Sequence, residues 1–104
     1  MAVTYNTPSE ILALINKNDS FHDCEVNWIE YDGKSKACIH FLDCEKSYHL
    51  LFDDVVSFSI YSDPSVMYIN EIQFSNDNGE LCIDISGADI IVKSKMLTIE
   101  EYGD

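Results

Sequence analysis

Residues 68–86 read YINEIQFSNDNGELCIDIS, and this stretch decides the fold. Asn78-Gly79 is a pair that two-residue type I′ hairpin turns favour, because both turn positions need a positive φ. A turn there gives the hairpin one apolar face, whose cross-strand pairs are Phe74 with Ile83 and Ile72 with Ile85. The opposite face carries polar or small side chains: Glu71, Gln73, Cys82 and Asp84. The stretch therefore predicts an antiparallel hairpin that is buried on one side only.

The same two-residue alternation continues through most of the chain after residue 23, interrupted by Gly, Asn, Asp and Ser. It predicts strands at 24–31, 37–42, 48–52, 55–61, 68–75, 80–86, 89–93 and 96–101. A turn near Cys44-Glu45 aligns one apolar set with another: Ala37, Ile39 and Phe41 with Tyr48, Leu50 and Phe52. A turn at Ser94-Lys95 produces two further apolar pairs: Val92 with Leu97, and Ile90 with Ile99. These registers predict an antiparallel meander with one face covered.

A short amphipathic helix is expected before the strands. Thr7-Pro8-Ser9-Glu10 matches a capping box, with Thr7 as the N-cap, Pro8 at the first helical position and Glu10 at the third. Apolar residues follow at helical spacing, and Asn16 to Asp19 is typical of a helix end. The expected fold is α+β: a single domain over 1–104, with one N-terminal helix packed on an antiparallel β-meander of about six to eight strands.

Charge restricts the partners of this domain. The chain holds 19 Asp and Glu against 6 Lys and no Arg, a formal net charge of −13 over 104 residues. Such a surface repels phosphate and attracts cations, so we expect no direct nucleic-acid binding and a basic protein as the partner. Hydrophobic residues make up 46% of the chain, and Trp28, six Tyr and five Phe are expected to supply a core. The acidity is therefore not that of a disordered tail.

Nothing in the sequence indicates export or a membrane. No segment approaches the roughly 20 apolar residues that span a bilayer, and Met1–Tyr5 lacks the basic and apolar regions of a signal peptide. We therefore expect a cytoplasmic protein whose four cysteines are reduced and structural, although an even count would suit disulfides in a secreted chain. These cysteines are Cys24, Cys38, Cys44 and Cys82. Exposed strand edges leave the oligomeric state, including a dimer, open.

The outward strand positions and loops carry most of the carboxylates. This pattern has two interpretations: a solvated surface that keeps the protein soluble, or a docking face that steers a basic partner. The candidate partner-binding carboxylates are Asp53, Asp54, Glu71 and Asp84. Tyr61 and Tyr68 are candidate aromatic anchors, because Tyr is enriched at binding hot spots. These tyrosines, with Tyr31 and Tyr102, could equally cap the edge of the core.

Catalytic and metal-binding patterns are sparse. His22-Asp23 suggests an oriented base, but neighbours in an extended strand point to opposite faces, which favours a surface His22. The predicted register places His40 directly opposite His49, where two imidazoles could bind a metal or respond to pH. Only Cys38 offers a third ligand, so no metal and no cofactor are expected. No nucleophile elbow, phosphate-binding loop or zinc-protease motif is present, and Asn76–Gly79 lacks the spacing of a calcium loop. We expect no catalytic residues and no enzyme.

The layout resembles small bacterial toxin-immunity proteins of polymorphic or contact-dependent toxin systems. The resemblance is carried by an opening helix, by Phe21-His22-Asp23 leading into Cys24–Tyr31, and by Leu50-Leu51-Phe52-Asp53-Asp54-Val55 before another strand. It implies a cytosolic inhibitor that covers the cationic site of a basic, nuclease-like toxin. The alternative is a DNA mimic or regulatory module that binds a nucleic-acid-binding protein. A third class is a small enzyme or ligand-binding domain that uses His40 and His49.

Overall fold

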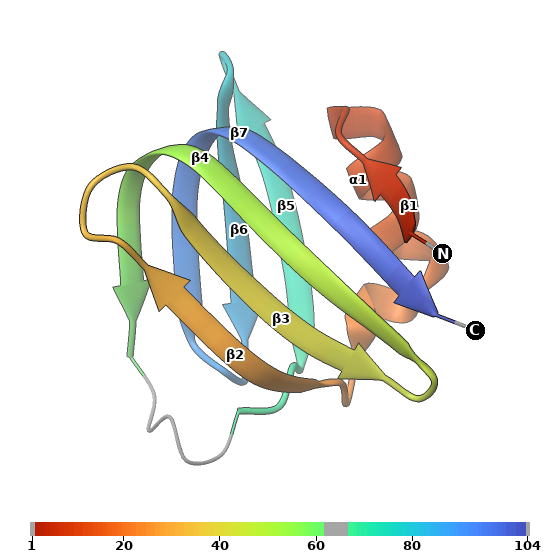
Figure 1. Cartoon of the computed structure of the whole chain (residues 1–104). Helices are drawn as coiled ribbons and strands as arrows, with labels where there is room; N and C mark the ends of the chain where they lie inside the picture. The colour runs from red at the N-terminus through yellow and green to blue at the C-terminus, as the bar shows by residue number, and fades with distance from the viewer. Residues whose placement is uncertain (1, 62–66, 104) are drawn as a thin grey trace.

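The structure, a computed structural model, describes residues 2–61 and 67–103 (Figure 1). It has one α-helix, a single 3₁₀ turn and one antiparallel sheet of seven strands, which confirms the predicted α+β class. Among the described residues, no helix has the length and apolar character needed to cross a membrane. The elements are β1 (Ala2–Tyr5), α1 (Pro8–Lys17), η1 (Asp19–Phe21), β2 (Glu25–Tyr31), β3 (Ala37–Asp43), β4 (Lys46–Ile60), β5 (Glu71–Asp77), β6 (Glu80–Ser86) and β7 (Ile90–Gly103).

Helix α1 begins at the predicted capping box. The Thr7 hydroxyl accepts the Glu10 N–H at 3.3 Å, and the Glu10 carboxylate accepts the Thr7 N–H at 3.2 Å. Two N–H groups that would otherwise have no partner in the first turn are thereby satisfied. The helix buries Ile11, Leu14 and Ile15 and ends at Lys17. Strand β1 before the helix was not predicted, because its four residues are too few to establish a period.

The sheet is two three-stranded meanders joined side by side. Its strand order is β2-β3-β4-β7-β6-β5, with β1 pairing the end of β7. Two predicted hairpin registers are confirmed. Phe74 lies opposite Ile83 across β5 and β6, and His40 lies opposite His49 across β3 and β4. The two long central strands, β4 of one meander and β7 of the other, pair along their length and join the meanders.

The predicted turn at Ser94-Lys95 is wrong, because β7 runs without interruption from Ile90 to Gly103. The buried positions of β7 change phase between Ser94 and Leu97, and the sequence alone cannot distinguish such a change from a turn. Strand β4 likewise merges the predicted strands 48–52 and 55–61. It contains Asp54 at φ 53° and a register shift between Val55 and Ser57. Both strands bend at the same place, as a β-bulge allows (Figure 1).

The bend folds the sheet around one core. Segment 67–70, which leads into β5, pairs with the start of β2: the Val26 N–H donates to the Met67 carbonyl and the Ile69 N–H to the Cys24 carbonyl, both at 2.8 Å. Helix α1 lies beside β5 and β1 and covers the side that the strands leave open (Figure 1). A buried aromatic cluster sits at the centre. Phe21 contacts Phe41 and Tyr48 edge-on, with ring centroids 4.8 and 4.7 Å apart.

Candidate functional site

Most described carboxylates have no cationic partner. Within residues 2–61 and 67–103, only three ion pairs form: His22 with Asp23 at 3.0 Å, Lys36 with Asp53 at 3.8 Å, and Lys46 with Glu101 at 3.7 Å. The remaining carboxylates lie mainly on outward strand positions or in turns, where water reaches them. The net charge of −13 is therefore left largely uncompensated by the described part of the fold.

Two predicted binding residues, Glu71 and Asp84, line one groove. This α1–β5 groove has a volume of about 450 Å³ and lies between helix α1 and strands β5 and β6. Gln73 lies opposite Asp84, and its side-chain amide donates to the Glu71 carboxylate at 3.0 Å. Leu12 and Ile15 of the helix form an apolar wall. The groove combines two carboxylates with an apolar side, so it suits a long cationic side chain.

Asp53 lies in a different cavity. This Glu30 hollow, of about 380 Å³, is lined by Glu30, Asp32, Lys36 and Asp53 and shares no lining residue with the α1–β5 groove. The backbone N–H groups of Lys34, Lys36 and Ser35 donate to the Asp32 carboxylate and lower its pKa. Asp54 is exposed and occupies the bend of β4. The predicted carboxylates thus do not form one continuous site.

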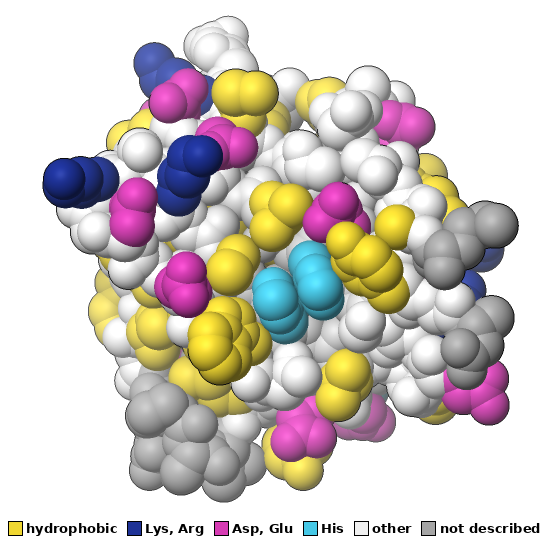
Figure 2. All heavy atoms as spheres, viewed as in Figure 1, with side chains coloured by type: hydrophobic (Ala, Val, Ile, Leu, Met, Phe, Trp, Pro, Cys, Tyr) yellow, Lys and Arg dark blue, Asp and Glu magenta, His cyan; other side chains and the backbone are white. Residues whose placement is uncertain are grey.

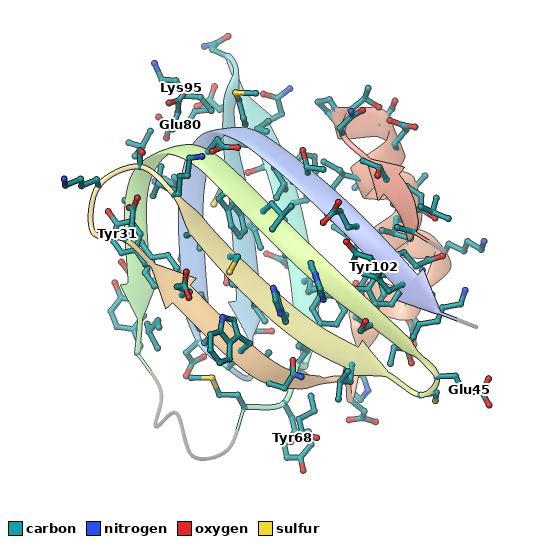
Figure 3. All side chains as sticks on the ribbon, viewed as in Figure 1. Tyr31, Glu45, Tyr68, Glu80, Lys95 and Tyr102 are labelled. Atoms are coloured by element: carbon teal, nitrogen blue, oxygen red, sulfur yellow. The ribbon has the colours of Figure 1, made fainter. Side chains whose placement is uncertain are left out.

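Tyr61 and Tyr68 stand apart from both cavities. Tyr61 is 74% exposed directly after β4, where its N–H donates to the Asp89 carbonyl at 2.9 Å. Tyr68 is 55% exposed and forms an isolated bridge with Glu25; Figure 3 shows it by the start of β2, far from Tyr102. Tyr31, by contrast, stacks on Phe58 at 4.8 Å and covers the edge of the core. Tyr61 and Tyr68 remain candidate anchors on geometry alone.

A row of aromatic and imidazole rings crosses the solvent-facing side of β2, β3, β4 and β7. Its four members, called here the ring row, are Trp28 on β2, His40 on β3, His49 on β4 and Tyr102 on β7. Their successive ring centroids lie 6.5, 3.7 and 4.7 Å apart, and the two imidazoles are stacked within 7° of parallel. Figure 2 shows two neighbouring histidines near the centre of this face, with hydrophobic side chains on both sides.

The expectation that Trp28 supplies the core is wrong, because its side chain is 53% exposed. Cys24 and Val26 are buried, so strict alternation would direct Trp28 inward as well. A register shift between Val26 and Trp28 reverses the phase, and Ile29 packs on the core instead. No signal in one sequence locates such a bulge. The opposed pair His40 and His49 was the only sign of the ring row in the sequence.

His22 and Asp23 do contact each other, which corrects the expectation that they point to opposite faces. Asp23 has φ 69°, a left-handed conformation that turns its carboxylate towards Nδ1 of His22 at 3.0 Å. The side chains are 51% and 85% exposed, so the prediction that His22 lies on the surface is confirmed. An exposed pair of this kind is strongly screened by water.

The other chemical groups do not converge. Within residues 2–61 and 67–103, no three His, Cys, Asp or Glu side chains are arranged to hold a metal ion. Cys38, the third ligand considered, lies opposite Leu51, in the rung next to the two imidazoles. Cys24 is buried, and burial raises the pKa of its thiol to about 12, whereas Cys44 is exposed in the β3–β4 turn.

Comparison with protein-family models, with curated proteins and with solved structures finds no match to this chain.

Proposed function

We propose that this chain is a cytoplasmic inhibitor that captures a basic protein, and that it serves as an immunity protein against a nuclease-like toxin. The observation that carries the proposal is the uncompensated charge: only three described carboxylates form ion pairs in a chain of net charge −13. Self-repulsion of such a charge opposes folding, and a cationic partner relieves it. The resemblance to toxin-immunity proteins supports the same class.

The mechanism is electrostatic capture. Glu71 and Asp84 lie on strands, so the backbone that carries them is already ordered and binding restricts only their side chains. Opposite potentials also speed encounter between the two proteins. In a nuclease, the cationic cleft binds substrate phosphates, and the carboxylates of the inhibitor would occupy that cleft in their place.

The test uses the protein encoded by the neighbouring reading frame, since immunity proteins and toxins are encoded side by side. We expect a 1:1 complex by calorimetry, loss of the partner's nuclease activity, and an affinity that falls as salt rises. The double variant Glu71→Gln/Asp84→Asn should bind about 3- to 30-fold more weakly, since two exposed charge pairs are lost.

Glu45→Gln/Asp89→Asn is the matched control, because it changes the net charge equally at two exposed turn positions outside both cavities. It should retain most of the affinity. The proposal is wrong if the neighbouring product neither binds nor is inhibited. Binding to a repressor or restriction factor instead would indicate the DNA-mimic alternative.

A further inference from the structure

We infer that the ring row and the Glu30 hollow beside it form the docking surface for an extended, arginine-bearing segment of the basic partner. The inference rests on the proposed function, since it names the surface that such a partner would contact. It also assigns a role to residues outside the predicted carboxylate sites. Four observations support it: ring exposure, the frame of carboxylates, the shape of the face and the stacked imidazoles.

The ring row exposes aromatic surface that the fold does not need. Trp28 is 53% exposed, and Leu42 on the same face is 41% exposed, although Val26 and Phe41 on the inner face of the same strands are buried. Trp and Tyr dominate binding hot spots, because they bury a large area with few rotatable bonds. The face therefore has Trp and Tyr anchors, whereas the α1–β5 groove has only Phe74 as an aromatic lining residue.

Carboxylates frame the row on both sides. Glu30 lies opposite Cys38, in the rung next to Trp28 and His40, and it lines the Glu30 hollow with Asp32 and Asp53. On the other side, Glu100 lies opposite His49 and accepts the Tyr102 hydroxyl at 3.0 Å. Lys46 lies at the start of β4, and Lys36 lines the hollow itself, 3.8 Å from Asp53. Among the described residues, Glu30, Asp32 and Glu100 form no ion pair and stay available to a cationic ligand. The frame is complementary to positive charge.

This chemistry selects arginine over a purely apolar or acidic ligand. A guanidinium stacks on Trp and Tyr faces through cation–π attraction and forms paired hydrogen bonds with carboxylates. The hollow of about 380 Å³ has room for one such side chain, in contact with Glu30. The row crosses four neighbouring strands, so a segment lying along it passes over all four rings. An extended segment with alternating arginines fits that geometry.

The stacked imidazoles make this surface sensitive to pH. Burial lowers the pKa of His40, and charge on His49 lowers it further, while Glu30 opposes both. The other titratable groups on this face beside the pair are Cys38, in the rung next to His40, and Glu100 and Tyr102, beside His49. His40 is therefore neutral near pH 7.5, and acidification places positive charge in the middle of the row. A cationic ligand is then repelled, so its affinity falls as the pH falls.

The experiment uses the intrinsic fluorescence of Trp28, the only tryptophan in the chain. We would titrate the full chain with a short synthetic peptide that alternates Arg and Gly, and with one that alternates Glu and Gly. Only the arginine peptide should give a saturable change, with a Kd about 3- to 10-fold weaker near pH 5.5 than near pH 7.5. A response to both peptides, or to neither, would overturn the inference.

Variants then show which residues bind the arginine peptide. Calorimetry replaces fluorescence here, because Trp28→Ala removes the fluorescent residue. Trp28→Ala should weaken arginine-peptide binding about tenfold, whereas Val56→Ala, at an equally exposed apolar position on the bend, should not. His40→Gln/His49→Gln should remove the pH effect and His22→Gln should keep it. Where a variant unfolds, amide shifts of the wild-type chain provide the check. Peptide-induced shifts confined to residues outside the ring row and the Glu30 hollow would contradict the inference.

The outcome is separable from that of the proposed function. If the neighbouring gene product binds with strong salt dependence but Trp28→Ala and His40→Gln/His49→Gln leave its affinity unchanged, the docking surface is wrong and the inhibitor function stands. If the arginine peptide binds at the row while no basic partner is inhibited, the surface stands and the inhibitor function fails. Self-association that Trp28→Ala abolishes would assign the face to a second copy and overturn the inference.

Discussion

The two halves of the sheet share a core but differ in what they present to solvent. On one side of the bend, β5 and β6 present Glu71, Gln73 and Asp84 beside a helix wall. On the other side, β2, β3 and the first half of β4 present stacked rings framed by carboxylates. Strands β4 and β7 run through both halves. The inner face therefore forms one core that both halves share, whereas the outer face carries two chemically distinct surfaces.

This difference predicts which changes damage both surfaces and which damage one. A change in the shared core should remove the two surfaces together. A change in the turn after β6, in the helix, or in the ring row should mainly affect the surface to which that element belongs. The expected free-energy effects decrease in that order.

The largest effect is expected from Phe21→Ala. Phe21 is 1% exposed and contacts Phe41 and Tyr48, so truncation should lower the free energy of unfolding by about 3–5 kcal/mol. Urea unfolding would be followed by Trp28 fluorescence, which reports the ring-row half, and by far-UV circular dichroism, which reports the whole sheet. Tyr61→Ala, at a 74% exposed position, is the control and should change stability by less than about 0.5 kcal/mol. Two separate transitions would show that the halves do not share one core.

Gly87→Ala should destabilise the acidic half next. Gly87 has φ +92°, and a Cβ there would lie 2.4 Å from the Tyr68 carbonyl oxygen and 2.7 Å from the Asn70 nitrogen. Left-handed strain and the backbone clash together should cost about 2–4 kcal/mol in urea unfolding. Gly33→Ala is the matched control, since φ is +79° there but nothing lies within 4 Å, and it should cost about 1 kcal/mol. Equal costs for the two variants would contradict the close approach of β6–β7 to segment 67–70.

Thr7→Ala tests the helix that walls the α1–β5 groove. Loss of the capping hydroxyl leaves the Glu10 N–H without its partner, so the unfolding free energy should fall by about 1 kcal/mol. Ser9→Ala, two residues later at an exposed position of the first helical turn, should have a smaller effect. Thermal melts of both variants provide the measurement. A Thr7→Ala melt that coincides with that of Ser9→Ala would show that the capping box does not anchor the helix.

The smallest effect concerns His40 and the ring-row side. A base whose pKa is lowered by folding contributes stability above its ordinary pKa of 6.5, and this stability is lost as the pH falls below that value. Wild type should therefore lose stability relative to His40→Gln between about pH 7 and pH 5.5. His22→Gln, at an exposed site, serves as the control. A difference between wild type and His40→Gln that stays constant with pH would contradict the burial of this imidazole.

Much of the fold could be predicted from local patterns. The Asn78-Gly79 turn and the capping box at Thr7 act within a few residues, so one sequence contains all their determinants. The bend at Ser94 could not be predicted in this way. A phase change in buried residues accompanies both a turn and a bulge, and only pairing of β7 with β4 over its whole length distinguishes them.

The candidate site was harder to predict because it depends on long-range placement. The alternation in β5 and β6 directed Glu71 and Asp84 outward, but their groove requires a helix from the start of the chain. Asp53 joins Glu30 only because β2, β3 and β4 are neighbours. The exposure of Trp28 depends on one extra residue in β2, which reverses the alternation expected there.

The most direct test of two distinct surfaces is the salt dependence of the Kd for the basic partner, measured by calorimetry on three proteins. Relative to wild type, Glu71→Gln/Asp84→Asn should reduce the slope of log Kd against log salt concentration, because charge pairs are lost. Trp28→Ala should weaken binding about tenfold at every salt concentration and leave the slope unchanged. An unchanged slope in the carboxylate variant, or unchanged affinity in Trp28→Ala, would contradict capture by one electrostatic and one aromatic surface.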